Sequence, residues 1–180
     1  VLYYLLSAGL EVFTKEPIHI DRVFRLYGGD EREVIKRYLK SKPLKVFHGY
    51  PRNDQPRMPF ALVMKTLEAT DTTFLGDFMG VDLVSDSVHI TGAEDGTEYQ
   101  VIHGARTTVN LETWIYSDHK DVLDFYYDIC WAVMDASKFV FEGLGMQPGL
   151  MSGTEVTYDP KVYPDYQYFS RIIMPVSGSR

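Results

Sequence analysis

Cysteine is nearly absent from this chain, which has a single one, Cys130, among 180 residues. A lone cysteine excludes a disulfide within one copy and any metal site built from cysteine pairs, and it suits a reducing compartment. Long apolar runs are absent as well, since none approaches the roughly 20 residues that a membrane-spanning helix needs. The apolar residues 1–6 are too short for a secretory signal and follow no basic residue. We therefore expect a globular protein without a membrane span.

Basic residues are missing from one long stretch. Between Lys65 and Arg106 lie 40 residues without a Lys or an Arg. Apolar residues are threaded through this stretch, so we expect it to fold, and its charge repels nucleic-acid phosphates or attracts a basic partner. The stretch contains eight acids: Glu68, Asp71, Asp77, Asp82, Asp86, Glu94, Asp95 and Glu98.

The rest of the charge is also unevenly spread. Residues 15–45 hold nine Lys or Arg against five Asp or Glu, whereas residues 46–180 hold nine against nineteen. The two parts could attract each other within one chain or between copies, and two ordinary solvated faces are the alternative. The overall pI of about 5.2 disfavours a dedicated DNA-binding protein and favours an acidic protein neighbour for the basic stripe. The stripe consists of Arg22, Arg25, Arg32, Lys36, Arg37, Lys40, Lys42 and Lys45.

Aromatic residues are plentiful. The chain has 13 Tyr and 10 Phe, and 45% of its residues are hydrophobic, enough for one compact domain. Tyr is enriched at protein interfaces because it buries a large area while keeping a polar tip. Core packing and protein contact are therefore both open interpretations of the excess.

The apolar periodicity predicts an α+β fold: a small, mostly antiparallel sheet flanked by a long helix, with an N-terminal helical hairpin. The hairpin breaks at residues 28–29, and Asp30 is expected to cap its second helix with Glu33. We divide the chain into an N-terminal helical arm, residues 1–43, and a main domain, residues 44–180. The spacing of three and four that indicates the first helix face is carried by Ile20, Val23, Phe24 and Tyr27.

Alternation and turn residues predict the strands. In residues 107–116 one face is expected to be buried (Val109, Leu111, Thr113, Ile115) and the other wetter (Thr108, Asn110, Glu112, Trp114, Tyr116). A long helix should begin at Ser117 or Asp118 and end near Leu144. The remaining strands are expected at 44–50, 60–67, 81–90 paired with 98–103, 150–158 and 166–176.

Motifs for enzymatic chemistry are missing. There is no G-x-S-x-G, no G-x-x-x-x-G-K-[ST] and no G-x-G-x-x-G. Glu94, Asp95 and Glu98 do not form a calcium loop, and we interpret Cys130 as a buried structural thiol. No metal-site spacing relates the five histidines His19, His48, His89, His103 and His119. We predict no catalytic, cofactor-binding or metal-binding residue, and a protein that is not an enzyme.

The order of several segments resembles the small neck and tail-terminator proteins of tailed bacteriophages. The similarity covers about residues 44–176 and rests on order and spacing rather than on any one motif. Its segments are Gly49-Tyr50-Pro51-Arg52-Asn53-Asp54, Met58-Pro59-Phe60-Ala61-Leu62-Val63-Met64, Phe74-Leu75-Gly76-Asp77-Phe78, the strand 107–116, the helix from Asp118, and Ser152-Gly153-Thr154-Glu155 before a Tyr-rich strand.

The resemblance implies a non-enzymatic structural protein of a phage virion, assembled in the host cytoplasm. It implies a homo-oligomeric ring, commonly hexameric, at the head-proximal end of the tail. The implied partners are the tail tube, the sheath if the tail is contractile, and neck or connector proteins, with DNA only as a passing, non-specific neighbour and no membrane. An acidic lumen, for which residues 66–105 are the natural candidate, would keep the duplex from sticking.

Three other interpretations stay open. Another neck or head-completion protein would join the connector to the tail without ending tube growth. A small acidic hydrolase would use carboxylates and a metal, and a binding module would act as a monomer on a basic target. The arm of residues 1–43 has no counterpart in the resemblance.

Overall fold

The structure is a computed structural model that describes the backbone of residues 1–49, 57–71, 86–90, 99–103, 106–155 and 168–179. Within these ranges the chain forms a six-stranded sheet in the order β1-β2-β5-β8-β6, with β7 also paired to β8, and a separate two-stranded sheet of β3 and β4. The strands are β1 (Lys45–His48), β2 (Phe60–Asp71), β3 (Asp86–Ile90), β4 (Tyr99–His103), β5 (Arg106–Ser117), β6 (Gln147–Pro148), β7 (Ser152–Glu155) and β8 (Tyr168–Ser179).

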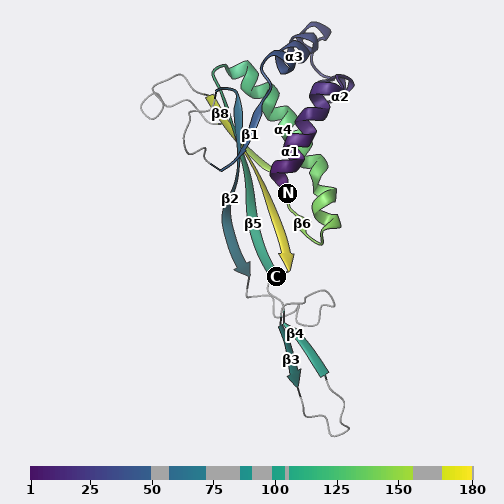
Figure 1. Cartoon of the computed structure of the whole chain (residues 1–180), viewed down its shortest axis with the longest axis vertical. Helices are drawn as coiled ribbons and strands as arrows, with labels where there is room; N and C mark the ends of the chain where they lie inside the picture. Colours follow the sequence, from purple (N-terminus) through teal and green to yellow (C-terminus); the bar gives the residue numbers. More distant parts are fainter. Residues whose placement is uncertain (50–56, 72–85, 91–98, 104–105, 156–167, 180) are drawn as a thin grey trace, which may run out of the picture.

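The sheet is mostly antiparallel, as the sequence predicts. Only β1 runs parallel to its neighbour β2, while β2 with β5 and β5 with β8 form long antiparallel ladders. The predicted hairpin of 81–90 with 98–103 is confirmed for its described part, where Asp86 pairs with His103 and Ile90 with Tyr99. In Figure 1 the ends of β2, β5 and β8 run beyond the helical layer, and β3 and β4 lie farther along the same direction.

Four helices complete the fold: α1 (Leu2–Lys15), α2 (Ile18–Val23), α3 (Gly29–Ser41) and α4 (Lys120–Gly143). The predicted α+β class with a long helix and N-terminal helices is confirmed. Figure 1 shows α1 and α4 side by side against one face of the sheet, and α4 contacts both β5 and β8. The helices therefore form one layer and the sheet the other.

The N-terminal helices differ in detail from the prediction. Pro17 separates α1 from α2. The helix face predicted for residues 20–27 is interrupted, because α2 ends at Val23. The cap of α3 is Gly28 rather than Asp30, and the Glu31 carboxylate accepts a hydrogen bond from the Gly28 N–H at 2.9 Å. Glu31 is the third residue of this helix, the position from which a carboxylate reaches back to the cap.

One hydrophobic core joins the N-terminal helices to the sheet. Leu6 of α1 and Phe24 after α2 have no exposed area, and they belong to the same cluster as Ile115 of β5, Ile129 of α4 and Ile172 of β8. Residues 1–43 and the residues that follow are thus packed into a shared interior. Amphipathic helices gain most of their stability from packing of this kind rather than from intrinsic propensity.

Helix α1 packs closely against α4 at Gly9. A Cβ atom at this position would lie 2.6 Å from Val133 Cγ1. Val133 is buried and β-branched, so it has little freedom to move aside. The absence of a side chain at Gly9 lets the two helices pack at this distance.

We expect Gly9→Ala to lower the free energy of unfolding by about 1–2 kcal/mol, because overpacking strain exceeds the gain in helix propensity. Denaturant titration followed by circular dichroism measures the change. Gly29→Ala is the matched control, since a Cβ there meets nothing within 4 Å, and it should leave stability unchanged or slightly raised. Equal stability of Gly9→Ala and the wild type would contradict the close packing of α1 on α4.

Candidate functional site

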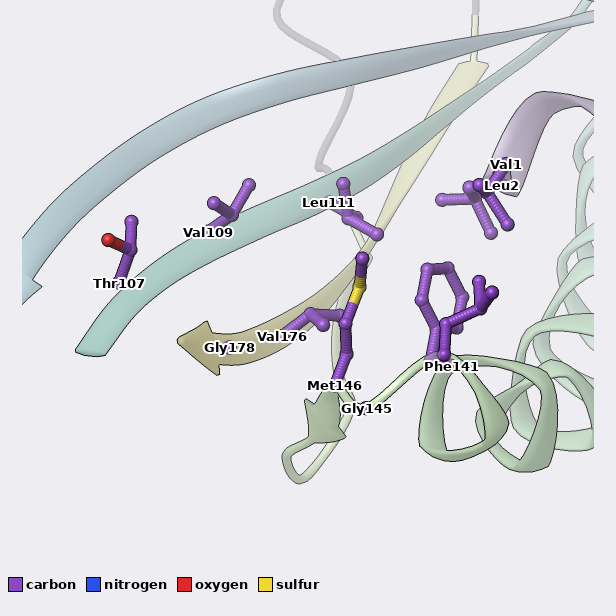
Figure 2. A pocket seen from close by; sticks show the side chains of 11 residues that line it. Val1, Leu2, Thr107, Val109, Leu111, Phe141, Gly145, Met146, Val176 and Gly178 are labelled. Carbon is purple, nitrogen blue, oxygen red and sulfur yellow. The ribbon is translucent and has the colours of Figure 1, made fainter. Parts of the chain in front are cut away.

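An apolar cavity of about 490 Å³ lies at the C-terminal end of α4. Figure 2 shows side chains from three parts of the fold around it: Val109 and Leu111 of β5 with Val176 of β8, Phe141 and Met146 at the end of α4, and Val1 and Leu2 at the start of α1. We call this recess the α4-end cavity. It lies on the helix-facing side of the sheet.

The chain turn after α4 shapes the cavity. Gly145 has a φ of +76°, a left-handed conformation that glycine adopts without strain. The Met146 N–H donates to the Phe141 carbonyl at 2.9 Å, and the Gly145 N–H donates to the Glu142 carbonyl at 2.9 Å. These bonds reverse the chain into β6, so that Met146 also lines the cavity.

The lining suits an apolar group. Thr107 is its only polar side chain, and this buried hydroxyl has no hydrogen-bond partner among the described residues. Three lining residues are also well exposed and form the rim: Val1 at 59%, Leu144 at 54% and Met146 at 36%. Exposed apolar area continuous with an apolar recess is typical of a surface that contacts another molecule.

The rim combines two helix ends of opposite polarity, because the N-terminal end of α1 and the C-terminal end of α4 both lie on it. The last turn of α4 contains no basic side chain, and Glu142, next to the lining residue Phe141, is exposed. The C-terminus of a helix carries a partial negative charge from its unsatisfied carbonyl groups.

The opposite face of the sheet carries an aromatic cluster. Phe60, Tyr116 and Phe169 lie in register on β2, β5 and β8. Their rings stack across the strands, with centroid distances of 4.7 Å for Phe60 to Tyr116 and 5.7 Å for Tyr116 to Phe169. The prediction of a wetter face on this side of 107–116 is wrong for Tyr116 and Glu112, which are buried. Cross-strand aromatic stacking explains the burial of Tyr116.

Glu112 is a buried carboxylate at the margin of this cluster. It accepts hydrogen bonds from the Thr66 hydroxyl at 2.6 Å and from Trp114 Nε1 at 2.7 Å. The guanidinium of Arg171 lies 3.8 Å from Glu112 and 5.4 Å from the centre of the Trp114 ring. The two donors and the nearby cation offset the cost of burying the charge.

The predicted basic stripe is partly neutralised by ion pairs, two with Asp21 in the arm and one with Asp118 outside it. Asp21 pairs with Lys36 at 3.0 Å and lies 3.8 Å from Arg32, and Lys42 lies 3.9 Å from Asp118. The structure therefore does not present eight free cations along one stripe. In the described part of the chain, no ion pair involves the exposed residues Arg22, Arg25, Arg37, Lys40 and Lys45.

The turn between α2 and α3, residues 24–28, is firmly held. Phe24 is fully buried and packs edge to face on Phe125 and on Tyr27, with centroid distances of 6.2 and 5.2 Å. The Tyr27 hydroxyl donates to Asp128 Oδ2 of α4 at 3.3 Å. Burial raises the pKa of the Asp128 carboxyl, and the hydrogen bond from Tyr27 opposes that rise. Between these anchors, Leu26 is 92% exposed. We call residues 24–28 the arm turn.

Several predicted candidates are not brought together. Among the described residues no group of three or more His, Cys, Asp or Glu is placed to hold a metal ion. His19 lies 3.1 Å from Glu16, its neighbour in the same arm. Of the acidic stretch, Glu68, Asp71 and Asp86 fall in described strands, whereas Asp77, Asp82, Glu94, Asp95 and Glu98 lie outside the described residues. Of the resemblance segments, residues 50–54 and 74–78 lie outside them too.

The interpretation of Cys130 as a buried structural thiol is confirmed. The side chain has no exposed area, and burial raises the pKa of its thiol to about 12. A thiol of this kind is protonated at neutral pH and is a poor nucleophile.

No helix in the described part of the chain has the length and apolar character to cross a membrane. Comparison with known proteins gives no identification: no protein-family model matches the chain, and no curated protein matches it.

Proposed function

We propose that this chain is a non-enzymatic structural protein of a tailed-phage virion. In this proposal its copies assemble into a ring at the head-proximal end of the tail, where the ring ends the tube and joins it to the neck. The sequence order over residues 44–176 supports this assignment, and so does the arrangement of a mostly antiparallel sheet with helices on one face. The tail tube, the neck proteins and, in a contractile tail, the sheath are the proposed partners.

The observation that carries the assembly role is the α4-end cavity. Its rim residues Val1, Leu144 and Met146 are exposed in one copy, and the recess is lined almost wholly by apolar groups. Burying such area against a neighbour is the main favourable contribution to protein association. A closed ring supplies that neighbour for every copy through one repeated contact.

The charge distribution supports the same role. The chain carries a net charge of -7, with 40 consecutive residues that contain no base. Negative charge on the inner wall of a ring repels the phosphates of passing DNA and keeps the passage clear. In this proposal residues 66–105 contribute that charge.

We expect the purified protein to have the mass of about six chains, alone or once tail tubes are added. Light scattering across a concentration series, with and without tubes, measures this. Reversing charge by Asp82→Lys with Asp86→Lys is expected to weaken assembly or attachment. A monomer that ignores tubes at every concentration would overturn the proposal. A ring that attaches to tubes without stopping their growth would identify another neck or head-completion protein instead.

A further inference from the structure

The pairing of β2 with β5 changes register at one point. Up to Lys65 the two strands pair residue for residue, and Lys65 lies opposite Leu111. The next pair is Leu67 with Asn110, so Thr66 is an extra residue on β2, as in a β-bulge. Every later residue of β2 is therefore displaced by one position from the pairing that an uninterrupted ladder would give.

A second register is open to the strand after the bulge. Without the extra residue, Thr66 would pair with Asn110, and each later residue of β2 would move to the opposite face of the sheet. The apolar pattern does not decide between the two registers, because residues 67–71 read Leu-Glu-Ala-Thr-Asp and residues 106–110 read Arg-Thr-Thr-Val-Asn. Strands with so few large apolar residues specify their register weakly.

The part of β2 before the bulge is firmly held. The ring of Phe60 stacks on that of Tyr116, with a centroid distance of 4.7 Å, and residues 61–63 are buried. A slip would therefore be confined to residues 66–71, where the strand can lose the bulge at Thr66 without disturbing the ladder before it.

The carboxylate of Glu112 distinguishes the two registers. Its Oε1 accepts a hydrogen bond from the hydroxyl of the bulged Thr66 at 2.6 Å, and its Oε2 accepts one from Trp114 Nε1 at 2.7 Å. Oε2 also lies 3.8 Å from Arg171 of β8, so the orientation of the carboxylate is held from two other sides. In the uninterrupted register Thr66 would be a diagonal neighbour of Glu112, about 7–8 Å away. The carboxylate could then reach Thr66 only by leaving Trp114.

We propose that Glu112 fixes the register of β2 beyond the bulge. The buried carboxylate connects Thr66 of β2 to β5 and, through Arg171, to β8. The bulged pairing makes this contact and the uninterrupted pairing does not, so the contact favours the bulge. Glu112 is thus a positioning residue of the sheet, and this role does not depend on the proposed ring.

The register determines where the acidic stretch begins on the sheet. Glu68 and Asp71 both follow the bulge, and in the bulged register they pair with Val109 and Arg106. Loss of the bulge would shift both acids by one position and exchange the faces on which they lie. A carboxylate before the acidic stretch therefore sets the placement of its first two charges.

A disulfide between the two strands can report the register. In the bulged register Ala69 lies opposite Thr108, whereas in the uninterrupted register Glu68 would take that place. We compare Ala69→Cys with Thr108→Cys and Glu68→Cys with Thr108→Cys in a glutathione buffer, and mass spectrometry measures the disulfide fraction. The Ala69 pair should be favoured by roughly tenfold or more, because side chains on opposite faces are not bridged without backbone movement. Cys130 has no exposed area and does not interfere.

Thr66→Val removes the hydroxyl and keeps the β-branched shape at an exposed position. We expect it to lower the preference for the Ala69 disulfide about fivefold, the equivalent of one net hydrogen bond. Thr70→Val is the matched control, since it makes the same exchange in the same strand, and it should keep the wild-type preference. Glu112→Ala should lower the preference further. Glu112→Gln should retain it, because the amide can still bond to both neighbours.

The preference for one disulfide is separate from stability, which circular dichroism measures on the same proteins. Equal preferences in the wild type, Thr66→Val and Glu112→Ala would overturn the inference and leave the pairing of Asp71 with Arg106 to fix the register. If Glu112→Ala does not fold, Thr66→Val and its control decide the question. Equal formation of the two disulfides without any further substitution would also overturn it, because neither register would then be selected.

Discussion

Replacing Leu6 with alanine is expected to lower the free energy of unfolding by about 2–5 kcal/mol. Leu6 has no exposed area and lies in the cluster that joins α1 to α4 and to the sheet. Truncation removes apolar burial and leaves a cavity that helices packed on both sides cannot easily close. Urea titration followed by tryptophan fluorescence measures the loss, because Trp114 and Trp131 lie outside the arm.

The same experiment tests whether the arm and the sheet unfold together. A shared core predicts one cooperative transition, with helical circular dichroism and tryptophan fluorescence changing at the same urea concentration. Tyr4→Ala is the control on α1, since Tyr4 is 74% exposed, and it should change stability by no more than about 0.5 kcal/mol. A Leu6→Ala protein that loses helix signal well before its fluorescence changes would contradict the shared core.

The helix that was easiest to predict is α4. Its buried apolar stripe runs from Val122 to Phe141, about five turns, and a signal that long is not produced by chance spacing. The end of α2 was harder, because Phe24 and Tyr27 keep the spacing of a helix face while lying in the arm turn. Both rings pack on Phe125 of α4. Phe125 lies 101 positions after Phe24 in the chain, so the local sequence does not reveal this contact.

The faces of β5 show a similar limit. Alternation correctly predicts that Thr113 and Ile115 are buried. It does not reveal what other strands place on the opposite face, where Phe60 and Phe169 stack on Tyr116. An alternating strand indicates that its two faces differ, but burial of the second face depends on partners from distant parts of the sequence.

The α4-end cavity leaves no local signature. Its lining comes from the start of α1, the first half of β5, the end of α4 and β8, so no single segment contains its pattern. The exposed apolar residues Val1, Leu144 and Met146 come to line one cavity only in the folded chain. The aromatic-rich composition favours a protein contact in general, but the position of such a contact on the surface depends on the fold.

Glu112→Ala is expected to lower the free energy of unfolding by about 2–4 kcal/mol, although alanine is a smaller and less polar residue that would be easier to bury. Removing the carboxylate leaves the Trp114 Nε1–H and the Thr66 hydroxyl without their acceptor. The half-buried Trp114 loses an acceptor that water only partly replaces, which costs more than an average hydrogen bond contributes, whereas the exposed Thr66 hydroxyl can turn to water. It also leaves Arg171, which lies against Trp114, without its nearby anion.

Glu112→Gln separates shape from charge. The amide oxygen can still accept from Trp114 and the amide N–H₂ can donate to the Thr66 hydroxyl, so only the attraction to Arg171 is lost. Because Arg171 is a third exposed, we expect this loss to be about 1 kcal/mol or less. Urea denaturation monitored by tryptophan emission measures the free energy of unfolding of both variants. If alanine is tolerated as well as glutamine, the hydrogen bonds to Glu112 do not hold the face together, and the stacked rings of Phe60, Tyr116 and Phe169 maintain it without the carboxylate.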